Sequence, residues 1–172
     1  MSEKYNAGDF AVYDTYGICT VNKIENLSLI SGTPKRKYYI LSPLNSASST
    51  YYVPVSGEAV NKLRAPMTEA EIQQLLLKAK ATSPVWIEKR QERNEYANRI
   101  LSMGITPELI SLIGCLYNRK QLLESQGKKL SATDEAIFSL AEKMVKEEWA
   151  FSLDIPADKV SEYIHSFMES IN

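Results

Sequence analysis

The stretch FAVYDTYGICTVNKI, residues 10–24, decides how the N-terminal part of this chain folds. A short apolar run at 10–13 is followed by the turn residues Asp14 and Gly17, and then by an alternating segment at 18–24. Strands have a two-residue period and turns favour Asp and Gly, so the stretch predicts two strands joined by a tight turn. The alternation places positions 18, 20, 22 and 24 on one face of the second strand.

Further strands are predicted on either side of polar loops. β character continues at 27–30, residues 31–34 form a loop, and residues 37–41 form another strand. A polar turn is predicted at 45–49, and the last clear strand follows at 51–55. Pro54 and Gly57 mark the end of this strand. Four or five short strands at this spacing predict a small, strongly bent SH3-like barrel or sheet.

After Arg64 the apolar residues recur with a helical period. Thr68 and Glu71 form a capping box for a helix that ends near Ala81. Ser83 and Pro84 are predicted to start the next helix, which carries Trp86 and stops at Gly104. Helices are also predicted at 106–126, from Ser131 to about 153, and at 160–167. The prediction is an α+β protein, with a β-barrel domain at residues 1–64 and an all-helical bundle at 65–172.

Trp86 is followed by residues that do not suit a core helix. Residues 88–95, EKRQERNE, contain no apolar side chain. A core tryptophan on a helix expects apolar neighbours three, four and seven positions on, yet these are Lys89, Arg90 and Arg93. A large ring beside a row of cations suits a nucleic-acid backbone, with the ring set against or between bases. The alternative is that Trp86 packs as a plug between the two domains.

Composition narrows the classes of function. The chain has 172 residues, of which 44% are hydrophobic and 24% charged, with a formal net charge of -1. A globally basic nucleic-acid binder is excluded, so any DNA contact must come from a local patch. The two cysteines, Cys19 and Cys115, lie far apart and indicate no zinc site. No run suits a membrane span or a signal peptide, and we expect a cytoplasmic protein without membrane contact.

Enzymatic function finds no support in the motifs. The only histidine, His165, has no nucleophile or carboxylate at catalytic spacing, and the glycines form no phosphate-binding loop. We therefore predict no catalysis, no cofactor, no metal and no small-molecule substrate. A pure interaction module is a second alternative, because tyrosines at 13, 16, 38, 39, 51 and 52 can build an aromatic cage. Strand alternation sends adjacent tyrosines to opposite faces, which favours core positions for most of them.

The ordered combination of motifs resembles the CarD-type bacterial transcription regulators, whose N-terminal module is shared with transcription-repair coupling factors. The resemblance covers about residues 6–164. It rests on GDFAVY at 8–13, GICTV at 17–21, Ile24-Glu25, YYIL at 38–41, Val53-Pro54, Trp86, GKKLSATDE at 127–135 and EWA at 148–150.

The resemblance implies a mechanism. The N-terminal barrel, Tudor-like in shape, would add an edge strand to the β subunit of RNA polymerase through Tyr51, Tyr52, Val53 and Pro54. The helical domain would contact promoter DNA at the upstream edge of the melted bubble, through the minor groove and phosphates and without sequence specificity. Trp86 would act as a wedge that holds the bubble open. The implied DNA contacts are Trp86, Lys89, Arg90, Arg93, Arg119, Lys120, Lys128 and Lys129.

The chain departs from the family pattern at two places. Tyr52 stands where members often carry an arginine, and Asn26 and Leu27 stand where a basic residue can follow Ile-Glu. The basic segment 35–37 can substitute for these basic residues in the polymerase contact, although a charged loop is usually only solvated. The remaining alternative is a protein–protein adaptor that binds polymerase or another partner without touching DNA.

Overall fold

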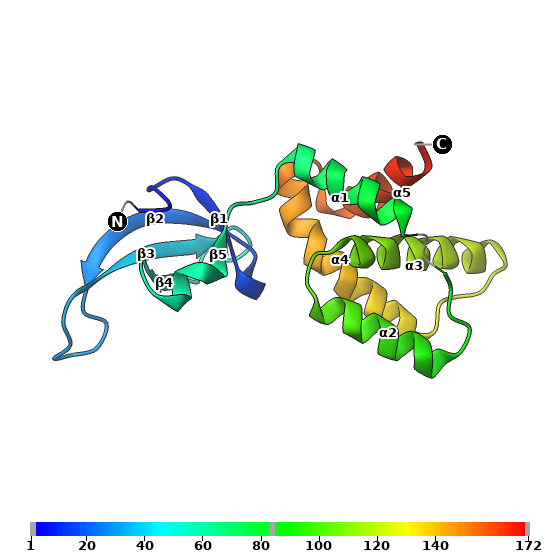
Figure 1. Cartoon of the computed structure of the whole chain (residues 1–172), viewed down its shortest axis with the longest axis horizontal. Helices are drawn as coiled ribbons and strands as arrows, with labels where there is room; N and C mark the ends of the chain where they lie inside the picture. Colours follow the sequence, from blue (N-terminus) through cyan, green and yellow to red (C-terminus); the bar gives the residue numbers. More distant parts are fainter. Residues whose placement is uncertain (1–2, 83–84, 171–172) are drawn as a thin grey trace. The chain divides into compact units, whose positions relative to one another are not determined.

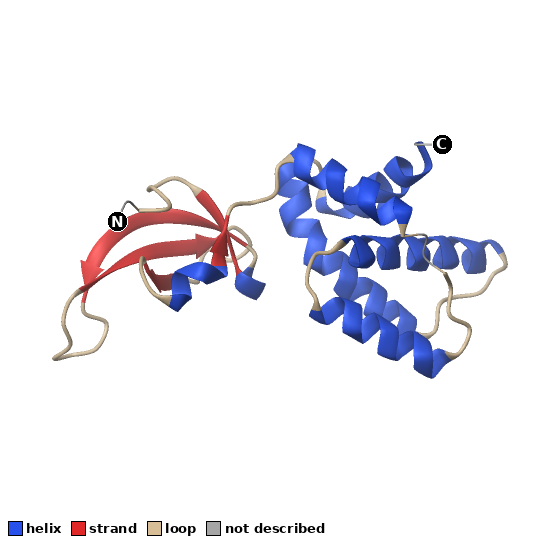
Figure 2. Ribbon diagram, in the orientation of Figure 1, coloured by secondary structure: helices blue, strands red, loops and turns tan. Residues whose placement is uncertain are grey.

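The structure is a computed structural model that describes residues 3–82 and 85–170. The chain is an α+β protein, with strands near the N-terminus and helices after them (Figures 1 and 2). It divides into two compact units, Met1–Pro66 and Met67–Asn172.

The N-terminal unit contains a five-stranded antiparallel sheet. Its strands are β1 (Phe10–Tyr13), β2 (Ile18–Leu27), β3 (Arg36–Pro43), β4 (Tyr51–Pro54) and β5 (Leu63–Arg64). The order across the sheet is β4-β3-β2-β1-β5, so β4 and β5 lie at its two ends. The first four strands were predicted from the sequence. The two-residue β5 was not, because it is too short to show a period.

A β-bulge changes the alternation in β2. The register between β2 and β3 shifts between Val21 and Lys23, and an extra residue on one strand reverses which positions face the core beyond it. Cys19 and Val21 are fully buried, and Ile24 packs against the same core. The prediction that position 24 shares a face with 18 and 20 is therefore wrong.

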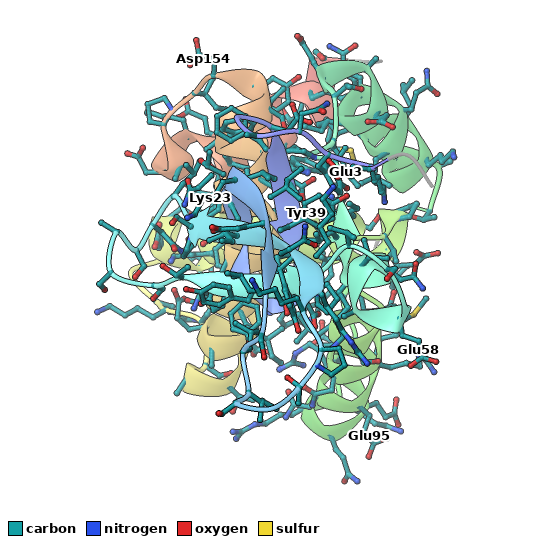
Figure 3. The ribbon with its side chains drawn as sticks, turned by 90° about the vertical axis from the view of Figure 1, so that its left-hand side faces the viewer. Glu3, Lys23, Tyr39, Glu58, Glu95 and Asp154 are labelled. Carbon is teal, nitrogen blue, oxygen red and sulfur yellow. The ribbon has the colours of Figure 1, made fainter. Side chains whose placement is uncertain are left out.

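The core of this unit is built around Tyr39, which is completely buried. Its hydroxyl accepts a hydrogen bond from the backbone N–H of Lys4 at 2.9 Å, and its ring packs edge-on against Tyr5. The end-on view in Figure 3 places Tyr39 among the strands. The segment before β1 is thereby fixed to the sheet.

The described part of the C-terminal unit is a bundle of five α-helices. They are α1 (Glu69–Ala81), α2 (Arg90–Ser102), α3 (Pro107–Ser125), α4 (Ala132–Leu153) and α5 (Val160–Ser170). α3 contacts the other four helices, as Figure 1 illustrates, and the fully buried Trp149 lies in the common core. No helix within the described ranges combines the length and apolar character needed to cross a bilayer.

Side-chain caps are present at the starts of α1, α3 and α4. Thr68 and Glu71 form a complete capping box at the start of α1. The side chains of Thr106 and Ser131 accept backbone N–H groups at the starts of α3 and α4. These caps satisfy donors that would otherwise lack partners at a helix N-terminus.

The predicted start of α2 is wrong. Ser83 and Pro84, the predicted cap and first residue, lie outside the described residues, but 85–89 are described and are not helical. α2 begins at Arg90. Trp86 therefore lies in a non-helical segment before the helix, so the residues after it do not continue a helical face that Trp86 begins.

Candidate functional site

Trp86 lies half-buried against its own helical bundle. It packs on the bundle core and helps to line a pocket whose other walls include Tyr96 of α2, Leu112 and Leu116 of α3, and Ile137 of α4. The missing apolar neighbours are thus supplied by other helices, not by positions further along one helix. The part of the ring that stays accessible is available to a partner.

Two arginines lie over the Trp86 ring. The guanidinium carbon of Arg93 is 4.3 Å from the ring centroid and that of Arg119 is 4.8 Å from it. Both distances are within the range at which a cation is attracted by the negative face of an aromatic ring. The structure therefore brings together Trp86, Arg93 and Arg119 from three different segments.

Arg93 forms a buried ion pair with Asp134. Its Nε donates to Oδ1 at 2.8 Å and its Nη2 donates to Oδ2 at 2.9 Å, the two-pronged geometry that suits guanidinium and carboxylate. The exposed side-chain fractions are only 11% for Arg93 and 3% for Asp134. Nη1 of Arg93 also donates to the carbonyl oxygens of Ile87 at 2.7 Å and Glu88 at 3.1 Å.

The charges of this pair are mutually stabilised. Burial alone would raise the pKa of Asp134, but hydrogen bonds from Arg93 and Ser131, together with the charges of Arg93 and Arg90, lower that pKa below its usual value. The hydrogen bond to Asp134 likewise raises the pKa of Arg93. Both groups are therefore charged at neutral pH.

The other predicted DNA contacts lie around the start of α4 or beside it in sequence. Arg90 donates to the hydroxyl of Thr133 at 2.7 Å, and Lys120 of α3 pairs with Glu135 at 2.8 Å. Lys128 and Lys129 are exposed in the loop that precedes α4.

Lys89 is the most exposed member of the ion pairs in this region. Its Nζ lies 2.8 Å from Glu92, and its side chain is 79% exposed. An exposed pair of this kind contributes little and exchanges readily with other partners. Lys89 is therefore freer than Arg93 to meet a phosphate.

The carboxylates of this region were not anticipated from the sequence. Asp134 and Glu135 were noted only as part of the motif at 127–135, and not as partners of Arg93 and Lys120. No sequence signal joins Arg93 to a residue 41 positions later. A buried aspartate that also accepts its own cap hydroxyl, from Ser131 at 2.6 Å, is visible only in the structure.

β4 offers a second candidate surface, at the end of the N-terminal sheet. Its residues pair with β3 in the register Tyr39↔Val53 and Leu41↔Tyr51, and the N–H of Val55 donates to Lys37 at 3.0 Å. In an antiparallel ladder, backbone groups point alternately toward and away from the partner strand.

Tyr52 follows from this register as the residue that faces outward. Because Val53 and Val55 point their backbone groups at β3, Tyr52 and Pro54 point theirs away from it. Pro54 has no N–H to donate, so within β4 Tyr52 alone presents both a donor and an acceptor to a further strand. Tyr52 as a residue is 45% exposed, whereas Val53 is buried.

Three of the tyrosines considered for an aromatic cage pack against one another. Tyr13, Tyr16 and Tyr51 form a cluster whose ring centroids are 4.6–5.6 Å apart. Rings packed this closely leave no space for an ammonium group between them, since a bound cation needs its own distance of several ångströms from each ring. This cluster therefore works as packing, and Tyr39 belongs to the core.

His165, the only histidine, lies against other side chains of the bundle. Its ring packs on Tyr117 with centroids 4.8 Å apart, and its Nε2 is 3.8 Å from Glu169. Among the described residues, no group of three or more His, Cys, Asp or Glu side chains is placed to hold a metal ion.

Comparison with protein-family models gives a match to the N-terminal unit. Residues 5–65 match the family model described as the CarD-like/TRCF RID domain. A search of curated proteins found no match for the chain. The matched range ends where the helical unit begins, so it includes β4 but not Trp86.

Proposed function

The N-terminal unit is a CarD-like/TRCF RID domain, an RNA-polymerase-interacting domain, and on this premise we propose that the chain is a bacterial transcription regulator that stabilises the promoter open complex. In this proposal the N-terminal unit binds the β subunit of RNA polymerase, and the helical unit contacts promoter DNA. The domain match together with the position of β4 at the end of the sheet carries the proposal.

β4 is the proposed polymerase-binding edge. A strand at a sheet edge can pair with a strand of another protein, and the backbone hydrogen bonds then supply affinity without specific side chains. Tyr52 supplies the outward N–H and C=O, so the tyrosine in place of an arginine does not prevent strand addition. We take the five-stranded sheet, with its bulge in β2, as an SH3-like or Tudor-like barrel in this family.

The surface around Trp86 is the proposed DNA contact. A half-buried ring can insert at a distorted base step in the minor groove without base-specific hydrogen bonds. Lys89, Lys128 and Lys129 are exposed and can meet the flanking phosphates. With a net charge of -1 the free protein attracts DNA weakly, but attachment to polymerase raises the local concentration of this surface near the promoter.

The proposed regulator works without catalysis and in the cytoplasm, where promoter DNA and polymerase meet. It uses no cofactor, metal or small-molecule substrate, because binding energy alone can lengthen the life of an open complex.

An adaptor that binds polymerase without touching DNA is the second candidate. The pairing of Arg93 with Asp134 and of Lys120 with Glu135 favours it, because both cations already have partners within the bundle. The two candidates differ in whether the surface around Trp86 is needed once polymerase is bound.

The polymerase contact is tested by two substitutions at one position. Tyr52→Pro removes the outward N–H, whereas Tyr52→Ala keeps it and removes the ring. Binding to purified bacterial RNA polymerase should fall about tenfold or more for Tyr52→Pro, as expected when a backbone hydrogen bond of a buried edge is left unmade. Tyr52→Ala should bind more tightly than Tyr52→Pro. Equal binding by wild type and Tyr52→Pro would rule out strand addition at β4.

A further inference from the structure

We propose that Arg93 positions the Trp86 segment and does not contact phosphate, with Asp134 holding Arg93 in place. This inference rests on the proposed function, since it concerns how the DNA-contacting tryptophan is presented. It replaces the predicted role of Arg93 as a phosphate contact.

The hydrogen-bond inventory of Arg93 argues for this role. A guanidinium has five N–H donors, and four of them are directed at partners within the bundle: one at each oxygen of Asp134 and two at the carbonyl oxygens of Ile87 and Glu88. A phosphate would have to displace these short bonds. The small exposed fraction of the side chain, 11%, also leaves little surface for DNA.

The two carbonyl acceptors explain why the arrangement matters for Trp86. Ile87 and Glu88 directly follow the tryptophan, in a segment that is not helical and so makes no helical backbone bonds. Arg93 supplies the donors for those carbonyls and places its guanidinium over the Trp86 ring. One side chain therefore fixes both the backbone and the ring of this segment.

Asp134 completes the arrangement from α4. Its backbone N–H donates to the hydroxyl of Ser131 at 3.1 Å, and its carboxylate accepts from the same hydroxyl, so its position is set by the helix cap. Through Asp134 the orientation of Arg93 is tied to a rigid helix N-terminus. A residue presented in this way keeps its ring pre-organised and loses less entropy when it binds DNA.

The test uses conservative substitutions that separate the two roles. Arg93→Lys keeps the positive charge that a phosphate contact needs but cannot reproduce the fork to Asp134. Asp134→Asn keeps the shape of the side chain and removes the charge, which would free a DNA-contacting arginine. Arg90→Lys is the matched control, because Arg90 makes one exposed bond to Thr133.

The first measurement is acrylamide quenching of tryptophan fluorescence in the free, full-length protein. Trp149 is completely buried, so quenching reports mainly on Trp86. Arg93→Lys and Asp134→Asn should each raise the quenching constant roughly twofold or more as the Trp86 segment opens locally. Arg90→Lys should leave it unchanged. If Arg93→Lys and Asp134→Asn both have the same quenching constant as wild type, the proposal is overturned.

The second measurement is open-complex lifetime on a promoter with cognate polymerase. Arg93→Lys and Asp134→Asn should shorten it to within about twofold of the Trp86→Ala value, and adding either change to Trp86→Ala should shorten it no further. Wild-type or longer lifetimes for both variants would contradict the positioning role of Arg93. If Trp86→Ala itself leaves the lifetime unchanged, the proposed function fails, while the quenching result still decides the role of Arg93.

Discussion

Among the ion pairs described in the helical unit, the pair between Arg93 and Asp134 should contribute most to the free energy of unfolding. Asp134→Ala removes both carboxylate oxygens and leaves the guanidinium, with an exposed side-chain fraction of 11%, to two carbonyl acceptors. Breaking a buried pair by removing one partner costs about 3–5 kcal/mol, and because those two acceptors remain we expect about 3 kcal/mol. For a unit of roughly 100 residues, this corresponds to a melting temperature lower by about 12–24 °C.

Tryptophan fluorescence during urea or thermal unfolding is the assay, because both tryptophans, Trp86 and Trp149, belong to the helical unit. The signal therefore follows this unit without a contribution from the sheet. Glu135→Ala is the matched control: it removes the next carboxylate along α4, whose partner Lys120 is partly exposed. An exposed pair is worth at most about 1 kcal/mol. The reasoning is refuted if Asp134→Ala costs no more than Glu135→Ala.

Three further predictions follow from particular groups. Because the folded pKa of Asp134 is lowered, its contribution to the free energy of unfolding should be complete above about pH 4, the ordinary carboxyl value. That contribution should be lost as the pH falls through the lowered value, and Asp134→Asn should show a flatter profile in urea midpoints below about pH 4. Thr68→Ala should cost about 1 kcal/mol in urea unfolding by breaking the α1 capping box, and an unchanged midpoint would contradict the role of the cap. Burial raises the pKa of the Cys115 thiol, so alkylation of Cys115 at neutral pH should be slow. Alkylation should be faster in Trp86→Ala, because this substitution opens the pocket that Cys115 also lines. Equal alkylation rates for the two proteins, measured by mass spectrometry, would count against that pocket.

The elements that could be predicted from the sequence are those encoded by local signals. The capping box at Thr68, the caps at Thr106 and Ser131, and the turn at Gly17 are short patterns with their own physical causes, and the structure contains each of them. Strands β1 to β4 follow from alternation and turn residues. Such signals depend on neighbours within a few positions, so a sequence reveals them directly.

The features that could not be predicted depend on contacts between distant segments. Just before α2, the carbonyls of Ile87 and Glu88 accept hydrogen bonds from Arg93, and Arg93 in turn donates to Asp134. The bulge in β2 depends on its pairing with β3. The polar run after Trp86 is visible in the sequence, but the partner of each nearby cation is visible only in the structure.

The most direct test of the central claim is the lifetime of an open complex formed by cognate RNA polymerase on a promoter. It is compared without the protein, with wild type and with Trp86→Ala, after binding to polymerase has been verified for both proteins. The account predicts a longer lifetime with wild type and loss of that effect in Trp86→Ala. A lifetime that wild type leaves unchanged while it is bound to polymerase would contradict the account and favour the adaptor.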